Sequence, residues 1–258
     1  MITVGVDLAA EPKRTAVAML EWDHEGVRLV ELLATADDEQ ILELAVQADK
    51  TGIDCPLGWS DDFVAFVNEH HAGNVASTPV DAAARVPLRY RATDLFLIEE
   101  KLGRPLSVSS DLIAVPAMRA AGLLAAMARA GIEVDRAGVT GGVAETYPAL
   151  AIRHWKLDGG KYKGAGNEGG LSAMADKLRR GFRGRLDLGE HRAAVRRSDD
   201  AFDALMCALV ARATMVYRGT AQIPRGLVQR ARREGWIAVP TCRLDELIAP
   251  VEYDPSAS

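Results

Sequence analysis

The segment Ile2-Thr-Val-Gly-Val-Asp-Leu-Ala9 decides the fold, because it places one acidic residue inside a strongly apolar run. Its β-branched residues predict a strand. An ionised Asp7 is expensive to bury in such a strand unless a cation or hydrogen-bond donors surround it. We therefore expect Asp7 to have a role beyond folding.

Working outward from this segment, the first third of the chain predicts three strands, a helix and a fourth strand. The first three strands are expected at Ile2–Ala9, Thr15–Trp22 and Val27–Thr35, joined by short turns into an antiparallel meander. A helix at Asp37–Asp49 then leads to a short apolar strand that ends at Asp54. A strand reached across a helix usually pairs in parallel.

The rest of the chain predicts a helical insertion, a fifth strand and a final long helix. The insertion covers about 59–110, the strand Val139–Tyr147, and the helix runs from Ser198 to about Tyr217. We expect an α/β fold with an RNase H-like mixed five-stranded sheet of order 3-2-1-4-5 and flanking helices. This domain would span 1–218, and a C-terminal extension at 219–258, with frayed last residues, would pack on its core.

Four other carboxylates are expected to join Asp7. Asp54 follows an apolar strand that neighbours the first strand in the predicted order. Asp200 and Asp203 share one face of the last helix, and Asp203 lies one turn inside it, where helix capping cannot explain a carboxylate. Glu145 ends the fifth strand, although a role as an arginine partner is equally compatible with the sequence.

This set of residues predicts a catalytic metal site. Asp7, Asp54, Asp200 and Asp203 would be the ligands, with Glu145 beside them. Carboxylates without a Cys or His partner set suit Mg²⁺ or Mn²⁺. Two such ions can activate a water and stabilise the leaving oxygen of a phosphodiester.

The acidic residues also belong to longer motifs. Five segments carry them: VGVDLA (Val4–Ala9), IDCPLG (Ile53–Gly58), YRATD (Tyr90–Asp94), ETYPAL (Glu145–Leu150) and SDDAFDAL (Ser198–Leu205). Together they resemble a family of predicted nucleases with an RNase H-like fold, known as domain of unknown function 429. The last segment also resembles the final acidic helix of Holliday-junction resolvases. By position, the resemblance implies metal-binding roles for Asp7, Asp54 and Asp200 or Asp203.

Basic residues provide candidate contacts to a nucleic acid substrate. The net charge is -5, yet Lys177 to Arg197 holds eight Lys or Arg against two acidic residues. The candidate substrate-binding residues are Arg85, Arg89, Tyr90, Arg91, Arg196 and Arg197. A salt-bridged surface is the alternative for each group. His191, which precedes the acidic helix, could assist a water or a leaving group.

Composition excludes several other classes of protein. The three cysteines are far apart and outside any CxxC spacing, which argues against a disulfide framework or a zinc site. The N-terminus lacks a secretory pattern, and charged residues interrupt the apolar stretch Ala201 to Tyr217. We expect a cytoplasmic protein that does not bind membranes.

Two other functions remain compatible with the sequence. One is a phosphotransferase or ATPase with an actin-like fold, which also begins with an Asp on its first strand. The turn at Ala10-Glu-Pro12 lacks the Gly- and Thr-rich phosphate loop of that fold. The other is a non-catalytic RNase H-like scaffold that binds a nucleic acid or a protein. These alternatives predict nucleotide binding and metal-independent binding, respectively.

Overall fold

A computed structural model describes residues 1–77, 79, 81–109, 111–158, 161–164 and 166–249. Within these ranges the chain forms an α/β fold with a mixed six-stranded sheet of order β5-β4-β1-β2-β3-β6. The strands are β1 (Ile2–Asp7), β2 (Ala16–Trp22), β3 (Val27–Leu33), β4 (Lys50–Asp54), β5 (Val143–Glu145) and β6 (Leu186–Asp187). The frayed end predicted at Asp254–Ser258 lies outside the described residues.

The sheet differs from the predicted one by an added edge strand. β6 pairs in parallel with the start of β3, so the prediction of a five-stranded sheet was wrong. A strand of two residues is too short to show a period in its sequence. β1, β2 and β3 pair antiparallel, and β4 lies parallel to β1, as expected for a strand reached across a helix.

The fifth strand is shorter than predicted, because a glycine turn precedes it. Gly138 and Gly141 have positive φ angles of 72° and 66°, which interrupt an extended backbone. Lys50 fixes this turn from β4: its buried ammonium donates to the carbonyl oxygens of Gly138, Thr140 and Gly141 at 2.9–3.0 Å. The strand therefore begins only at Val143.

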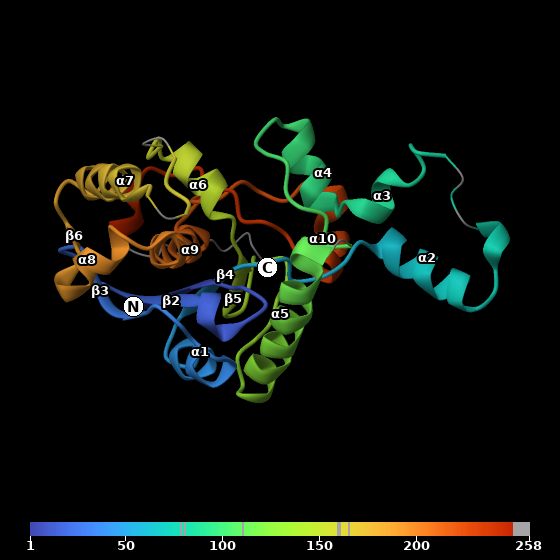
Figure 1. Cartoon of the computed structure of the whole chain (residues 1–258), viewed down its shortest axis with the longest axis horizontal. Coiled ribbons are helices and arrows are strands. Elements are labelled where there is room, and N and C mark those ends of the chain that lie inside the picture. Colours follow the sequence, from blue (N-terminus) through green and yellow to red (C-terminus); the bar gives the residue numbers. More distant parts are fainter. Residues whose placement is uncertain (78, 80, 110, 159–160, 165, 250–258) are drawn as a thin grey trace.

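Helices cover both faces of the sheet (Figure 1). One face packs on α1 (Asp38–Ala45) and α5 (Asp111–Arg129) through Val4, Val6 and their neighbours. The other face packs on α6 (Pro148–His154), α7 (Glu168–Gly181) and α9 (Asp199–Met215), and α8 (Arg192–Val195) precedes α9. The remaining helices are α2 (Asp61–His71), α3 (Val86–Arg89), α4 (Ala92–Glu99) and α10 (Val228–Glu234).

The predicted insertion contains α2, α3 and α4. Figure 1 shows α2 and α3 extending away from the sheet, whereas α4 lies against the C-terminal part of the chain. The C-terminal part of the chain lies beside the edge strand β5. The backbone N–H of Ala238 donates to the carbonyl oxygen of Glu145, the last residue of that strand, at 2.9 Å. Trp236 and Ile237 are buried there.

α5 is the longest apolar helix in the described part of the chain. Its segment Leu112–Arg129 is long and apolar enough to span a membrane by length and composition, and 33% of it is buried. One such helix is weak evidence for a span, because a core helix passes the same test. Ala120, Leu123 and Met127 of α5 are indeed core residues.

Two glycines let α9 lie directly on the sheet. Gly5 of β1 and Gly52 of β4 are paired in register. A Cβ atom on Gly5 would lie 2.1 Å from the carbonyl oxygen of Ala204 and 2.2 Å from the nitrogen of Ala208. A Cβ atom on Gly52 would lie 2.5 Å from the carbonyl oxygen of Cys207. Both strands therefore need glycine where α9 crosses them.

Replacing Gly5 with alanine tests this contact. Since α9 backbone would have to move, we expect Gly5→Ala to lower the free energy of unfolding by roughly 3 kcal/mol. Gly122→Ala is the matched control: its Cβ would meet nothing within 4 Å on α5. Because helix interiors favour alanine over glycine, the control should gain about 0.5–1 kcal/mol. Urea unfolding measures both, and equal effects of the two substitutions would contradict the close contact.

Candidate functional site

Asp7 and Asp54 end neighbouring parallel strands. They are Cα partners in the β1–β4 ladder, so they lie side by side. Side chains two residues apart on a strand share a face. Asp7 therefore shares the face of Gly5, and Asp54 that of Gly52, which is the face that α9 covers. The two carboxylates consequently meet the beginning of α9.

α9 brings its own carboxylates to the same place. Ser198 caps the helix, and its hydroxyl oxygen accepts from the backbone N–H of Ala201 at 3.2 Å. Asp200 is partly exposed in the first turn, whereas Asp203 is fully buried. Asp203 precedes Ala204, whose carbonyl oxygen lies over Gly5. The close packing of α9 on β1 thus positions Asp203 near the strand ends.

Burial, with added repulsion between neighbouring carboxylates, raises the pKa values at this site. Burial, followed by repulsion from Asp54 and Asp203, raises the pKa of Asp7 to about 9. Burial and Asp203 likewise raise the pKa of Asp54 to about 7. Burial also raises the pKa of Asp200, with Asp199 adding to the effect. Without a cation, the site therefore holds protons near neutral pH.

A lysine outside the predicted set contacts this site. Nζ of Lys163 lies 2.6 Å from Oδ2 of Asp203, an ion pair rather than a well-directed hydrogen bond. The hydroxyl of Tyr162 donates to Oδ1 of the same residue at 3.2 Å. Burial works to lower the pKa of Lys163, but Asp203 raises it above its ordinary value. Lys163 could not be predicted from the sequence, because nothing in a glycine-rich loop indicates which distant carboxylate a lysine reaches.

The chemistry of the donors suits a hard cation, although the geometry is not that of a complete metal site. The donors are carboxylate oxygens, which Mg²⁺ and Mn²⁺ prefer. Among the described residues, no group of three His, Cys, Asp or Glu side chains is arranged to hold a metal ion. Lys163 instead provides a positive charge beside Asp203. Asp203 acts electrostatically on both Asp7 and Asp54, so these three carboxylates form the acidic group of this site.

Glu145 lies near this site but is paired with an arginine. Its two carboxylate oxygens accept from Nη1 and Nη2 of Arg91 at 2.7 and 2.6 Å. The backbone N–H of Leu57 donates to Oε2 at 3.0 Å. All of these groups are buried. The arrangement matches the alternative of an arginine partner for Glu145.

The basic and aromatic residues before α4 occupy two different environments. Arg91 is 1% exposed and also donates to both oxygens of Asp94, at 3.0 and 3.2 Å. It therefore connects the insertion to β5 from inside the protein. Arg85 and Arg89 are exposed, and the guanidinium of Arg89 lies 5.3 Å from the ring centre of Tyr90. Only the exposed side chains are placed to meet a large ligand.

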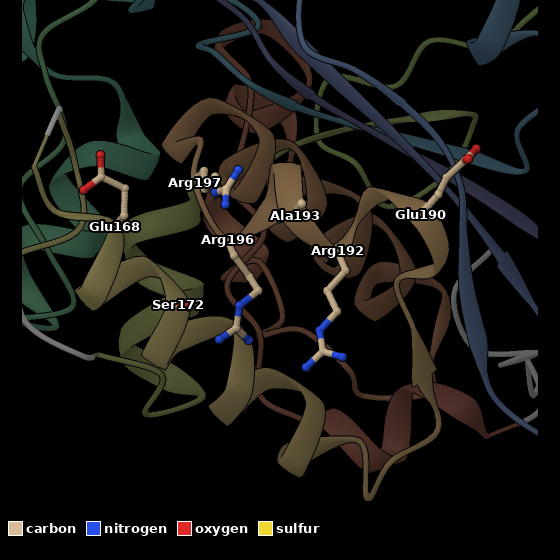
Figure 2. Close-up of a pocket in the computed structure, with 7 residues that line it drawn as sticks. All are labelled: Glu168, Ser172, Glu190, Arg192, Ala193, Arg196 and Arg197. Atoms are coloured by element: carbon tan, nitrogen blue, oxygen red, sulfur yellow. The ribbon is translucent and has the colours of Figure 1, made fainter.

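The second predicted basic group lines a hollow of about 470 Å³ between α7 and α8. Figure 2 shows Arg192 and Arg196 extending in the same direction beside it. Nη2 of Arg196 donates to Asp176 at 3.2 Å, whereas Arg197 is exposed immediately before the Ser198 cap. His191 is partly buried in a short 3-10 helix at Gly189–His191. This hollow is separate from the group formed by Asp7, Asp54 and Asp203.

The raised pKa of Asp7 predicts how metal-free stability depends on pH. The folded pKa of about 9 exceeds the ordinary 3.8, so the folded state binds the proton more tightly. Its stabilising effect is complete below pH 3.8 and is lost as pH rises towards 9. Asn cannot ionise, so Asp7→Asn should be more stable than wild type at pH 8, by on the order of 1–2 kcal/mol.

Thermal unfolding in EDTA between pH 5 and 9 measures this effect. The advantage of Asp7→Asn should shrink as pH falls. Glu43→Gln, at an exposed position of α1, serves as the control and should follow wild type at every pH. A constant difference between Asp7→Asn and wild type would show that ionisation of Asp7 is not responsible.

Comparison with known proteins gives one match. The sequence model of a family described as Protein of unknown function (DUF429) matches residues 5–227. This range includes both strand-end carboxylates, the insertion and all of α9. No curated protein and no solved structure matches the chain.

Proposed function

We propose that this chain, which belongs to the family Protein of unknown function (DUF429), is a divalent-metal-dependent phosphodiesterase that acts as a nuclease. The observation that carries the proposal is that Asp7 and Asp54 at the carboxyl ends of β1 and β4 lie beside Asp203 of α9. A protein that packs three repelling carboxylates together gives up stability unless a cation balances them. Such a loss of stability is typical of functional sites.

The proposed roles follow from the elements that carry each side chain. Asp7 and Asp54 belong to two rigid central strands and would set the position of the ions. Asp203, and Asp200 at the rim, would complete the ligand set from α9. When bound, two Mg²⁺ or Mn²⁺ ions would supply an activated water and stabilise the leaving oxygen of a phosphodiester. Glu145 would support Leu57 and Arg91 behind the ligands.

An RNase H-like architecture is part of the proposal. Without the edge strand β6, the remaining strands run β5-β4-β1-β2-β3. The acidic residues lie at the ends of the two central parallel strands and on the helix that crosses them. This arrangement supports the fold assignment, but fold alone does not establish an activity.

A nucleic acid is the proposed substrate. We expect the protein to act on it in the cytoplasm. Arg197 is exposed next to the start of α9, and Arg192 extends from α8 beside the hollow. Arg85 and Arg89 are exposed on the insertion. Cationic side chains of this kind bind phosphates without regard to sequence. The overall net charge of -5 would confine such binding to these basic surfaces.

A cleavage assay tests the function. Full-length protein with Mg²⁺ or Mn²⁺ should cleave at least one of single-stranded DNA, duplex DNA, branched DNA and RNA. Since metal ions contribute several kcal/mol to such reactions, Asp7→Asn and Asp54→Asn should each lower kcat/KM by about 10³-fold. EDTA should have the same effect, and Glu43→Gln should leave the rate unchanged.

Two results would reject the proposal. One is the absence of cleavage together with the absence of Mn²⁺ binding by calorimetry. The other is cleavage that survives both EDTA and Asp7→Asn. Nucleic acid binding that persists in EDTA without cleavage would instead support a non-catalytic scaffold.

A further inference from the structure

We propose that Lys163 is the internal cation of the acidic site and competes with a divalent ion for Asp203. This inference rests on the proposed function and deepens it, because it specifies what must move before an ion can bind. The Nζ–Oδ2 distance of 2.6 Å between Lys163 and Asp203 is the contact on which it depends.

The burial of the two partners differs in a way that suits competition. The side chain of Asp203 is 0% exposed, whereas that of Lys163 is 60% exposed. The carboxylate is therefore fixed inside the protein, and the ammonium reaches it from the solvent side. A lysine whose side chain is 60% exposed can withdraw without opening the core. Asp203 cannot leave, because α9 holds it against the sheet.

The charge of Lys163 acts on the whole group of carboxylates. Its ammonium group is paired with Asp203 and also interacts electrostatically with Asp7, Asp54 and Asp200. A single ammonium group thus does electrostatically, in part, what a divalent ion would do. Lys163 and an ion beside Asp203 would repel each other, so occupancy by one disfavours the other.

Three further contacts hold the residues on either side of Lys163 against α9. The hydroxyl of Tyr162 donates to Oδ1 of Asp203 at 3.2 Å, and the Tyr162 ring packs edge-on against Phe202. The backbone N–H of Gly164 donates to Oδ2 of Asp199 at 2.9 Å. Residues 162 to 164 are therefore attached to the first turns of α9 on both sides of Lys163. These contacts can persist while the lysine side chain alone turns outward.

Titration of Mn²⁺ into full-length variants by calorimetry tests the inference. Lys163→Met removes the competing charge, so its affinity for Mn²⁺ should exceed that of wild type by on the order of tenfold, or about 1.4 kcal/mol. Lys163→Gln should behave in the same way, whereas Lys163→Arg keeps the charge and should remain near wild type. Lys161→Met removes an exposed charge from the same loop and should also remain near wild type.

The outcomes separate this inference from the proposed function. Equal or weaker Mn²⁺ binding by Lys163→Met, alongside clear binding by wild type, would overturn the competition and leave the metal chemistry standing. A similar gain in Mn²⁺ affinity in Lys161→Met would show that loss of any positive charge from the loop strengthens binding. That result would overturn the specific role of Lys163. No Mn²⁺ binding by any of these folded proteins would overturn the competition, and together with the absence of cleavage it would also reject the proposed function. Thermal unfolding of each variant establishes that it is folded.

Discussion

The close contact of α9 with Gly5 and Gly52 is the constraint on which the rest of the structure depends. Any larger side chain at Gly5 would collide with the α9 backbone around Ala204 and Ala208. Because the two glycines are paired in register, neither strand has a side chain at the place where α9 packs on them. The position of the helix along the sheet is thereby fixed, and so is the position of every side chain in its first turns.

The same packing creates an electrostatic conflict. Two residues beyond each glycine, on the same face, stands an aspartate, and α9 adds Asp203 opposite them. The helix that stabilises the core through apolar burial thus also desolvates three carboxylates, which raises the pKa of Asp7 to about 9. Lys163 offsets part of this repulsion from the solvent side. Stability and a concentrated negative charge therefore come from one set of contacts.

The central elements could be predicted from the sequence because their signals are local. A strand reached across a helix usually pairs in parallel, and the predicted order placed the strand of Asp54 next to that of Asp7, as the structure has it. Ser198 with acidic residues after it marks the start of α9. Asp203 stood out because capping could not account for it, and it is indeed fully buried.

Long-range pairs could not be predicted in this way. Arg91 and Glu145 are 54 residues apart, and either could have faced solvent or a ligand. Lys163 and Asp203 are also far apart in the sequence, and the loop that carries the lysine has no periodic pattern to orient it. β6 has two residues, too few to show alternation. In each case the contact depends on the tertiary structure, because the fold decides which distant segments lie next to each other.

The most direct measurement for the central claim is anomalous diffraction from crystals of the full-length protein grown or soaked with Mn²⁺. We expect an anomalous peak bonded to carboxylate oxygens of Asp7, Asp54 and Asp203, with Nζ of Lys163 withdrawn from Asp203. Well-diffracting crystals at saturating Mn²⁺ with no peak between these residues, and with the Lys163–Asp203 ion pair intact, would contradict it.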